Sequence, residues 1–225
     1  MPDRRLVRVG SVSAMLGAIM LIVTNIMHPR GAEFGDTAEH LQEIADSGIY
    51  LGDHIGLLVG ALLLVGGLVG LSHSLADGGG AAWARLGLAV AVAAAALMTV
   101  VIAVDGIALK AVADEWASSQ NESLFQAAYV LEQIGLGLLA MLIFFIFGVL
   151  YILYGLAVAL SDIYPKWLGW LALVLGTAGA VIGLVQAYRG PSDILTNVLF
   201  PIVSILLTVW VLVMGILMWR KTSAA

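Results

Sequence analysis

The chain has 225 residues, of which 61% are hydrophobic and 11% are charged, and its formal net charge is −5. Soluble domains average about 25% charged residues, so this composition excludes an ordinary soluble domain and predicts an all-α, polytopic membrane protein. Cysteine is absent, which excludes disulfides, thiolate metal ligands and thiol nucleophiles.

Apolar segments long enough to cross a membrane recur along the whole chain. A spanning helix needs about 20 apolar residues. The segments lie at 9–27, 50–72, 86–109, 124–160, 166–187 and 194–219. They predict a bundle of six transmembrane helices, surrounded by membrane lipids, that forms a single domain over residues 1–225.

The basic residues near the segment ends predict the orientation, because Lys and Arg favour the cytoplasmic side. One side of the predicted bundle holds most of them: Arg4, Arg5, Arg8, Arg85, Lys166, Arg220 and Lys221. The other side holds three: Arg30, Lys110 and Arg189. We therefore expect a multi-pass protein of the cell membrane with both termini in the cytoplasm.

The first segment ends at His28-Pro29, where proline disfavours helical geometry in the residue before it. Residues 29–49 then form an acidic loop on the outer side. Asp36 and Glu39 have the spacing of a capping box, and apolar residues follow at helical spacing, which predicts a short surface helix in this loop. The acids are expected to form a solvated face, and a cation-collecting mouth is the alternative.

The second segment combines close-packing glycines with ionisable residues. Gly52, Gly56 and Gly60 recur every fourth residue, the small-xxx-small pattern of membrane helix packing. Asp53 lies near this glycine face, whereas His54 is turned about 100° away. We therefore expect Asp53 and His54 to face different neighbouring helices.

The third segment carries an acid at membrane depth. It is expected to end near Lys110, which puts Asp105 roughly 7–8 Å inside that end. Ionisable groups at such depth are costly and usually functional. Ser119 and Glu122 have capping-box spacing and predict the start of the fourth helix.

The last three segments add further polar residues. Tyr129 and Glu132 are three residues apart and share a helical face, so the phenol is expected to donate a hydrogen bond to the carboxylate. Gln186 lies near the end of the fifth segment, and Pro201 is expected to kink the sixth or to open a gap in its backbone.

Two short motifs carry a family resemblance. Leu153-Tyr154-Gly155-Leu156-Ala157, followed by the YPKWLGW segment at 164–170, resembles the inner loop of a family of small bacterial multi-span membrane proteins of unknown function. His28-Pro29 at the end of the first span is also similar. The resemblance implies a multi-span fold and brings no activity with it.

Antiparallel threading of the six segments places polar residues from five of them at one depth on the outer side. His28, His54, Asp105 and Glu132 are the candidate ligands of a divalent metal ion, for which zinc, iron and manganese are the candidates. Three further polar residues are expected to support these ligands: Tyr129, Gln186 and Asp53. The structural alternative is that the histidines cap helix ends and the acids bond neighbouring helices. Haem ligation by His28 and His54 is less favoured, because two histidines alone are a weak signal.

Three functions follow from this arrangement. A metal site would support hydrolysis or redox chemistry on a lipid-borne or small substrate. A proton-coupled carrier using Asp105 and Glu132 is the first alternative. The second is a non-catalytic accessory subunit whose glycine faces bind a membrane-protein partner or a second copy of the chain. Phosphate loops, GxSxG elbows and basic faces are absent from the sequence, so no nucleic-acid partner is expected.

Overall fold

The computed structural model describes residues 3–28 and 36–223, and these residues form helices and short connections without a β-strand. Arg30 and Glu33, which belong to the predicted outer loop, lie outside the described residues. The elements in chain order are α1 (Arg4–Met27), α2 (Thr37–Asp46), α3 (Tyr50–Ser74), α4 (Ala81–Val101), η1 (Ile102–Leu109), α5 (Lys110–Ser119), α6 (Glu122–Leu142), η2 (Ile143–Val149), α7 (Leu150–Ala159), α8 (Lys166–Arg189), η3 (Ile194–Leu199) and α9 (Phe200–Ser223).

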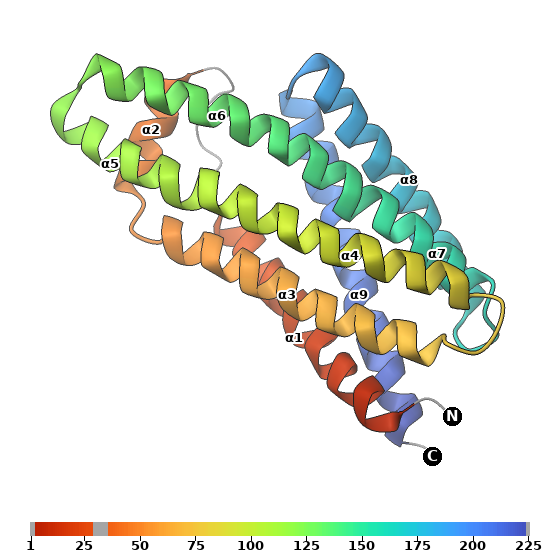
Figure 1. Ribbon diagram of the computed structural model, residues 1–225. Coiled ribbons are helices and arrows are strands. Elements are labelled where there is room, and N and C mark those ends of the chain that lie inside the picture. Colours follow the sequence, from red (N-terminus) through yellow and green to blue (C-terminus); the bar gives the residue numbers. More distant parts are fainter. Residues whose placement is uncertain (1–2, 29–35, 224–225) are drawn as a thin grey trace.

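Within the described residues, six continuous helices are long and apolar enough to cross a membrane, which confirms the six-helix membrane bundle. They are formed by α1, α3, α4–η1–α5, α6–η2–α7, α8 and η3–α9. Both ends of the chain lie at one end of the bundle, and α2 and α5 lie at the other (Figure 1). We call these the terminal end and the α2 end. Which of them faces the cytoplasm stays a prediction from the basic residues.

The spans pack in a closed order around the bundle. The α1 helix packs against α3 and α9, α3 against α4, α4 against α7, α7 against α8, and α8 against α9. This order matters for the site, because it brings α1, α3 and η1 together and puts α8 next to α6, α7 and α9.

Glycines hold α1 and α3 in close antiparallel contact, as the glycine pattern predicts. A Cβ atom added to Gly10 would lie 2.6 Å from the Cα atom of Gly70, and one added to Gly56 would lie 2.6 Å from the Thr24 side chain. Gly60 contacts Leu21 in the same way, whereas Gly52 has open space around it. The contact fixes the register of the two helices.

The third span extends further than predicted. The helix continues through Lys110 as α5 and ends at Ser119, so Asp105 lies well inside a continuous helix rather than near its end. The α5 extension remains helical because α2 covers it, with Leu41 and Ile44 fully buried against an apolar cluster that includes Trp116. The next helix begins at a different cap, since the Asn121 side chain accepts from the backbone N–H groups of Ser123 and Leu124.

Three spans contain π-helical turns, which are rare and frequently occur at functional sites. The η1 segment carries Asp105 in the third span, and η2 lies in the fourth. The η3 segment ends just before Pro201, which has no backbone N–H, and this is where the sixth span was expected to be disturbed. All three segments contribute residues to one cavity.

Candidate metal centre

A cavity of about 370 Å³ occupies the half of the bundle nearest the α2 end. Its walls come from α1, α3, α4–η1, α6–η2–α7 and η3–α9, and α2 contributes to its mouth. Polar and charged lining residues gather toward the α2 end: Asn25, His28, Asp36, Thr37, His40, Glu43, Tyr50, His54, Asp105, Tyr129, Glu132 and Gln133. The deeper lining is mainly aliphatic and aromatic.

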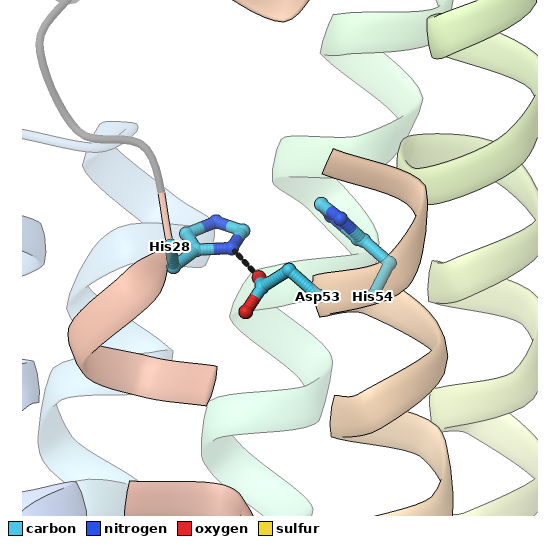
Figure 2. A group of neighbouring side chains, drawn as sticks. All are labelled: His28, Asp53 and His54. Carbon is cyan, nitrogen blue, oxygen red and sulfur yellow. Dashed lines mark hydrogen bonds and ion pairs between the residues drawn. The ribbon is translucent and has the colours of Figure 1, made fainter. Parts of the chain in front are cut away.

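His28 and Asp53 form a contact between α1 and α3 (Figure 2). The Nδ1 atom of His28 lies 2.8 Å from Oδ2 of Asp53. A carboxylate only accepts hydrogen bonds, so Nδ1 carries the proton in this contact. The glycine register of α1 and α3 produces the contact, because Thr24 opposite Gly56 places the end of α1 beside Asp53.

Asp53 is a buried acid, and one of its two carboxylate oxygens has no hydrogen-bond partner among the described residues. Its side chain is 1% exposed, and its Oδ1 atom has no hydrogen-bond partner among the described residues. A buried carboxylate oxygen without a partner is costly. A cation bound at Oδ1 would satisfy it.

His54 lies on the next face of α3 and points toward the third span, as the 100° offset between His54 and Asp53 predicts. Its Nδ1 atom donates to the backbone carbonyl of Tyr50 at 2.8 Å, and its Nε2 atom lies 3.2 Å from Oδ2 of Asp105. A neutral ring donating at Nδ1 would point its Nε2 lone pair at the carboxylate. The contact is therefore favourable only with a proton or a metal ion between the two atoms.

The backbone of η1 makes room for the His54 ring. A Cβ atom on Gly106 would lie 2.7 Å from the Cβ atom of His54, so the imidazole packs directly against a residue without a side chain. The hydroxyl of Tyr50 donates to Oδ1 of Asp105 at 3.3 Å. His54 and Asp105 are thus held in place from both sides.

His28, Asp53 and His54 can be arranged around one ion. Ligand atoms of the three side chains all lie within 4.8 Å of one another, and the two imidazole rings have centroids 5.0 Å apart. Two imidazoles and one carboxylate suit zinc or iron, and three protein ligands leave positions for water and substrate. Asp105 joins this group through its contact with His54.

Glu132, predicted as a ligand of the same ion, belongs to a second group. Its two carboxylate oxygens bond to α2, with Thr37 Oγ1 donating at 2.6 Å and His40 Nδ1 lying 2.5 Å away. Burial lowers the pKa of His40, but the hydrogen bond to Glu132 and the charge of Glu132 outweigh it, so the pKa lies above its ordinary value. Asp105 and Glu132, on which the carrier alternative depends, therefore bond to different histidines.

Sequence reasoning left His40 out of the site, since it treated the helix after Asp36 as a solvated face. The spacing contained a signal, because Thr37 and His40 are three residues apart and share one face of α2. The spacing did not show that this face turns toward Glu132.

Two of the residues expected to support the ligands are placed elsewhere. Tyr129 is 47% exposed and lines the cavity, while the oxygens of Glu132 bond to α2 instead of its phenol. Gln186 is buried on α8 but does not line the cavity. The reason is the packing order, in which α8 lies against α6, α7 and α9 rather than against α1 and α3.

Comparisons with protein-family models, with curated proteins and with solved structures give no match to this chain.

Proposed function

We propose that the protein is a metal-dependent membrane hydrolase whose ion is held by His28, Asp53 and His54. The observation that carries this proposal is the convergence of these three side chains, with ligand atoms within 4.8 Å of one another. Two of them, His28 and His54, line the polar end of a cavity inside the bundle. The buried Asp53 Oδ1, which has no partner among the described residues, supports it. The ion would replace the proton between His28 Nδ1 and the Asp53 carboxylate, and it would bind Nε2 of His54, whose contact with Asp105 Oδ2 needs a proton or a cation between the two atoms.

The chemistry follows from the charge of the ion. His28, Asp53 and His54 would hold a divalent cation, which would lower the pKa of a bound water and supply a hydroxide at neutral pH. Attack of this hydroxide on the carbonyl carbon of an ester would break the carbon–oxygen bond to the leaving alcohol. Asp105 lies beside His54, where its carboxylate can take the proton of the water and return it to the leaving alkoxide.

The surroundings of the site favour a substrate from the membrane. The cavity is lined by apolar residues below the histidines, and it lies within spans that face lipid. The weak resemblance to multi-span bacterial membrane proteins agrees with such a setting and adds no activity.

Ester hydrolysis by the purified protein in detergent micelles tests this function. A panel of short- and long-chain esters should be hydrolysed, a strong chelator should abolish turnover, and zinc, iron or manganese should restore it. The His54→Ala variant should be inactive, and Asp46→Asn, which removes an exposed acid on α2, should be as active as the wild type. Turnover that survives chelation or the His54→Ala change would contradict the proposal.

A further inference from the structure

The cavity is continuous from the histidines into the apolar middle of the bundle. Along α3 its lining residues run from Tyr50 through His54, Leu57 and Ala61 to Leu64, a path of roughly 20 Å by the helical rise. The lining residues of the third span also change from polar to apolar toward the terminal end. Asp105 is followed there by Ile102, Met98, Ala95 and Ala91. One lumen therefore joins a polar site to a long apolar channel.

Some of the residues that line the cavity are also exposed. Ile205 lines the cavity and is 40% exposed, and it lies about 16 Å along the span from Ile194. Tyr129 and Gln133 on α6 also line the cavity and are exposed. The medium around the span at the depth of Ile205 is hydrocarbon, so the apolar part of the cavity lies at the depth of the lipid chains.

The volume of the cavity and the charges of its lining residues limit the kinds of ligand that can bind. A cavity of about 370 Å³ is near the lower end of the roughly 300–1,000 Å³ of ligand pockets, which suits one hydrocarbon chain and is small for a two-chain lipid. The lining contains Asp36, Glu43, Asp105 and Glu132, and it contains no Lys or Arg among the described residues. In the protein without a bound ion, an anionic head would be repelled by these acids, whereas an uncharged head would not.

We infer that the cavity binds a single-chain lipid with an uncharged ester head, such as a monoacylglycerol. The head lies beside His54, and the chain extends toward Leu64. The assignment of the ester as the bond cleaved rests on the hydrolase proposed above. Occupancy of the apolar channel by the chain does not depend on the metal.

Photolabelling tests the binding site. The probe is a monoacylglycerol with a diazirine near the end of its acyl chain, added to the full chain in lipid nanodiscs. Labelled peptides are expected to contain cavity-lining residues such as Leu64, Met98 and Ile205. Excess unlabelled monoacylglycerol should compete for labelling, and a lysophosphatidic acid of the same chain length should compete much less. Equal competition by the two lipids would overturn the inference that the site prefers an uncharged head.

A matched pair of variants separates the cavity from the outer surface. Ala95→Phe fills the channel, whereas Ala96→Phe adds the same ring on the exposed face of the same helix. We expect labelling to fall by about tenfold or more in Ala95→Phe, because a phenyl ring occupies the path of the chain. Labelling should be unchanged in Ala96→Phe. If Ala95→Phe does not elute as a folded protein, Ala95→Leu replaces it, with a smaller expected loss.

The outcomes distinguish this inference from the hydrolase. Equal labelling of Ala95→Phe and wild type, or labels confined to outward-facing residues, would overturn the lipid site even if a metal is bound. Labelling of a metal-loaded wild-type protein that hydrolyses none of the esters would support the lipid site and refute the hydrolase.

Discussion

Replacing Asp53 by asparagine separates the charge of this side chain from its shape. The amide has nearly the same volume, and its oxygen can still accept from Nδ1 of His28, which lies 2.8 Å from Oδ2 in the wild type. Since the side chain is buried and Oδ1 has no partner among the described residues, the change removes the one negative charge that the proposed ion contacts directly from α3. The helix packing should persist.

The size of the effect follows from the role proposed for this carboxylate. Loss of a group that only orients a metal-binding histidine weakens metal affinity about 10–100-fold, which is about 1.4–2.7 kcal/mol. Because the Asp53 carboxylate is proposed as a ligand, we expect the loss to lie near the upper limit, at about 100-fold. Competition titration against a chromophoric chelator in detergent measures the dissociation constants of wild type and variant.

The control variant changes an acid that lies outside the proposed metal site. Asp46→Asn removes an exposed acid at the same end of the bundle, and its metal affinity should match that of the wild type. An Asp53→Asn protein that binds metal as tightly as Asp46→Asn would refute the assignment of Asp53.

The remaining predictions concern stability. Because the folded-state pKa of His40 is raised, its contact with Glu132 stabilises the fold fully below the ordinary histidine pKa of about 6.5, and this contribution disappears as the pH rises through the raised value. Thermal unfolding of the wild type across this range should show the loss and Glu132→Gln should not, whereas an equal pH dependence in both would contradict it. Gly10→Ala should destabilise the bundle by roughly 1–3 kcal/mol, because its Cβ would lie 2.6 Å from backbone of α3. Gly137→Ala, with open space around it, should unfold at or slightly above the wild-type temperature, and equal losses in both would contradict the contact.

Periodicity predicted much of the fold because the forces that determine it are local. Apolar length is sufficient to define a span, and the six spans agree with the structure. The angular offset between Asp53 and His54 correctly assigned them to different neighbours, His28 on α1 and Asp105 on η1. Such offsets depend only on the helical repeat.

The rest of the site depends on packing that no local pattern contains. Gln186 was placed near the histidines because its depth is similar, yet depth does not say which spans are neighbours, and α8 packs on the other side of the bundle. The end of the third span was placed at Lys110 because the residues after it are polar. They remain helical to Ser119 since α2 folds over them, a contact between segments distant in sequence.

The pairing of His28 with Asp53 depends on the register of α1 against α3. Gly56 and Gly60 pack against Thr24 and Leu21, and an antiparallel register with these contacts necessarily brings the end of α1 beside the start of α3. The glycine pattern identified the face but not its partner helix, so the register could not be derived without the structure.

The metal content of the purified protein tests the central claim most directly. Elemental analysis by mass spectrometry, after purification without chelators or a polyhistidine tag, should find about one zinc, iron or manganese ion per wild-type chain. The His54→Ala protein should contain almost none, and Glu132→Gln, which alters the separate group with His40, should retain the wild-type amount. A wild-type protein that holds no metal even after incubation with these ions, or an occupancy unchanged by His54→Ala, would contradict the account.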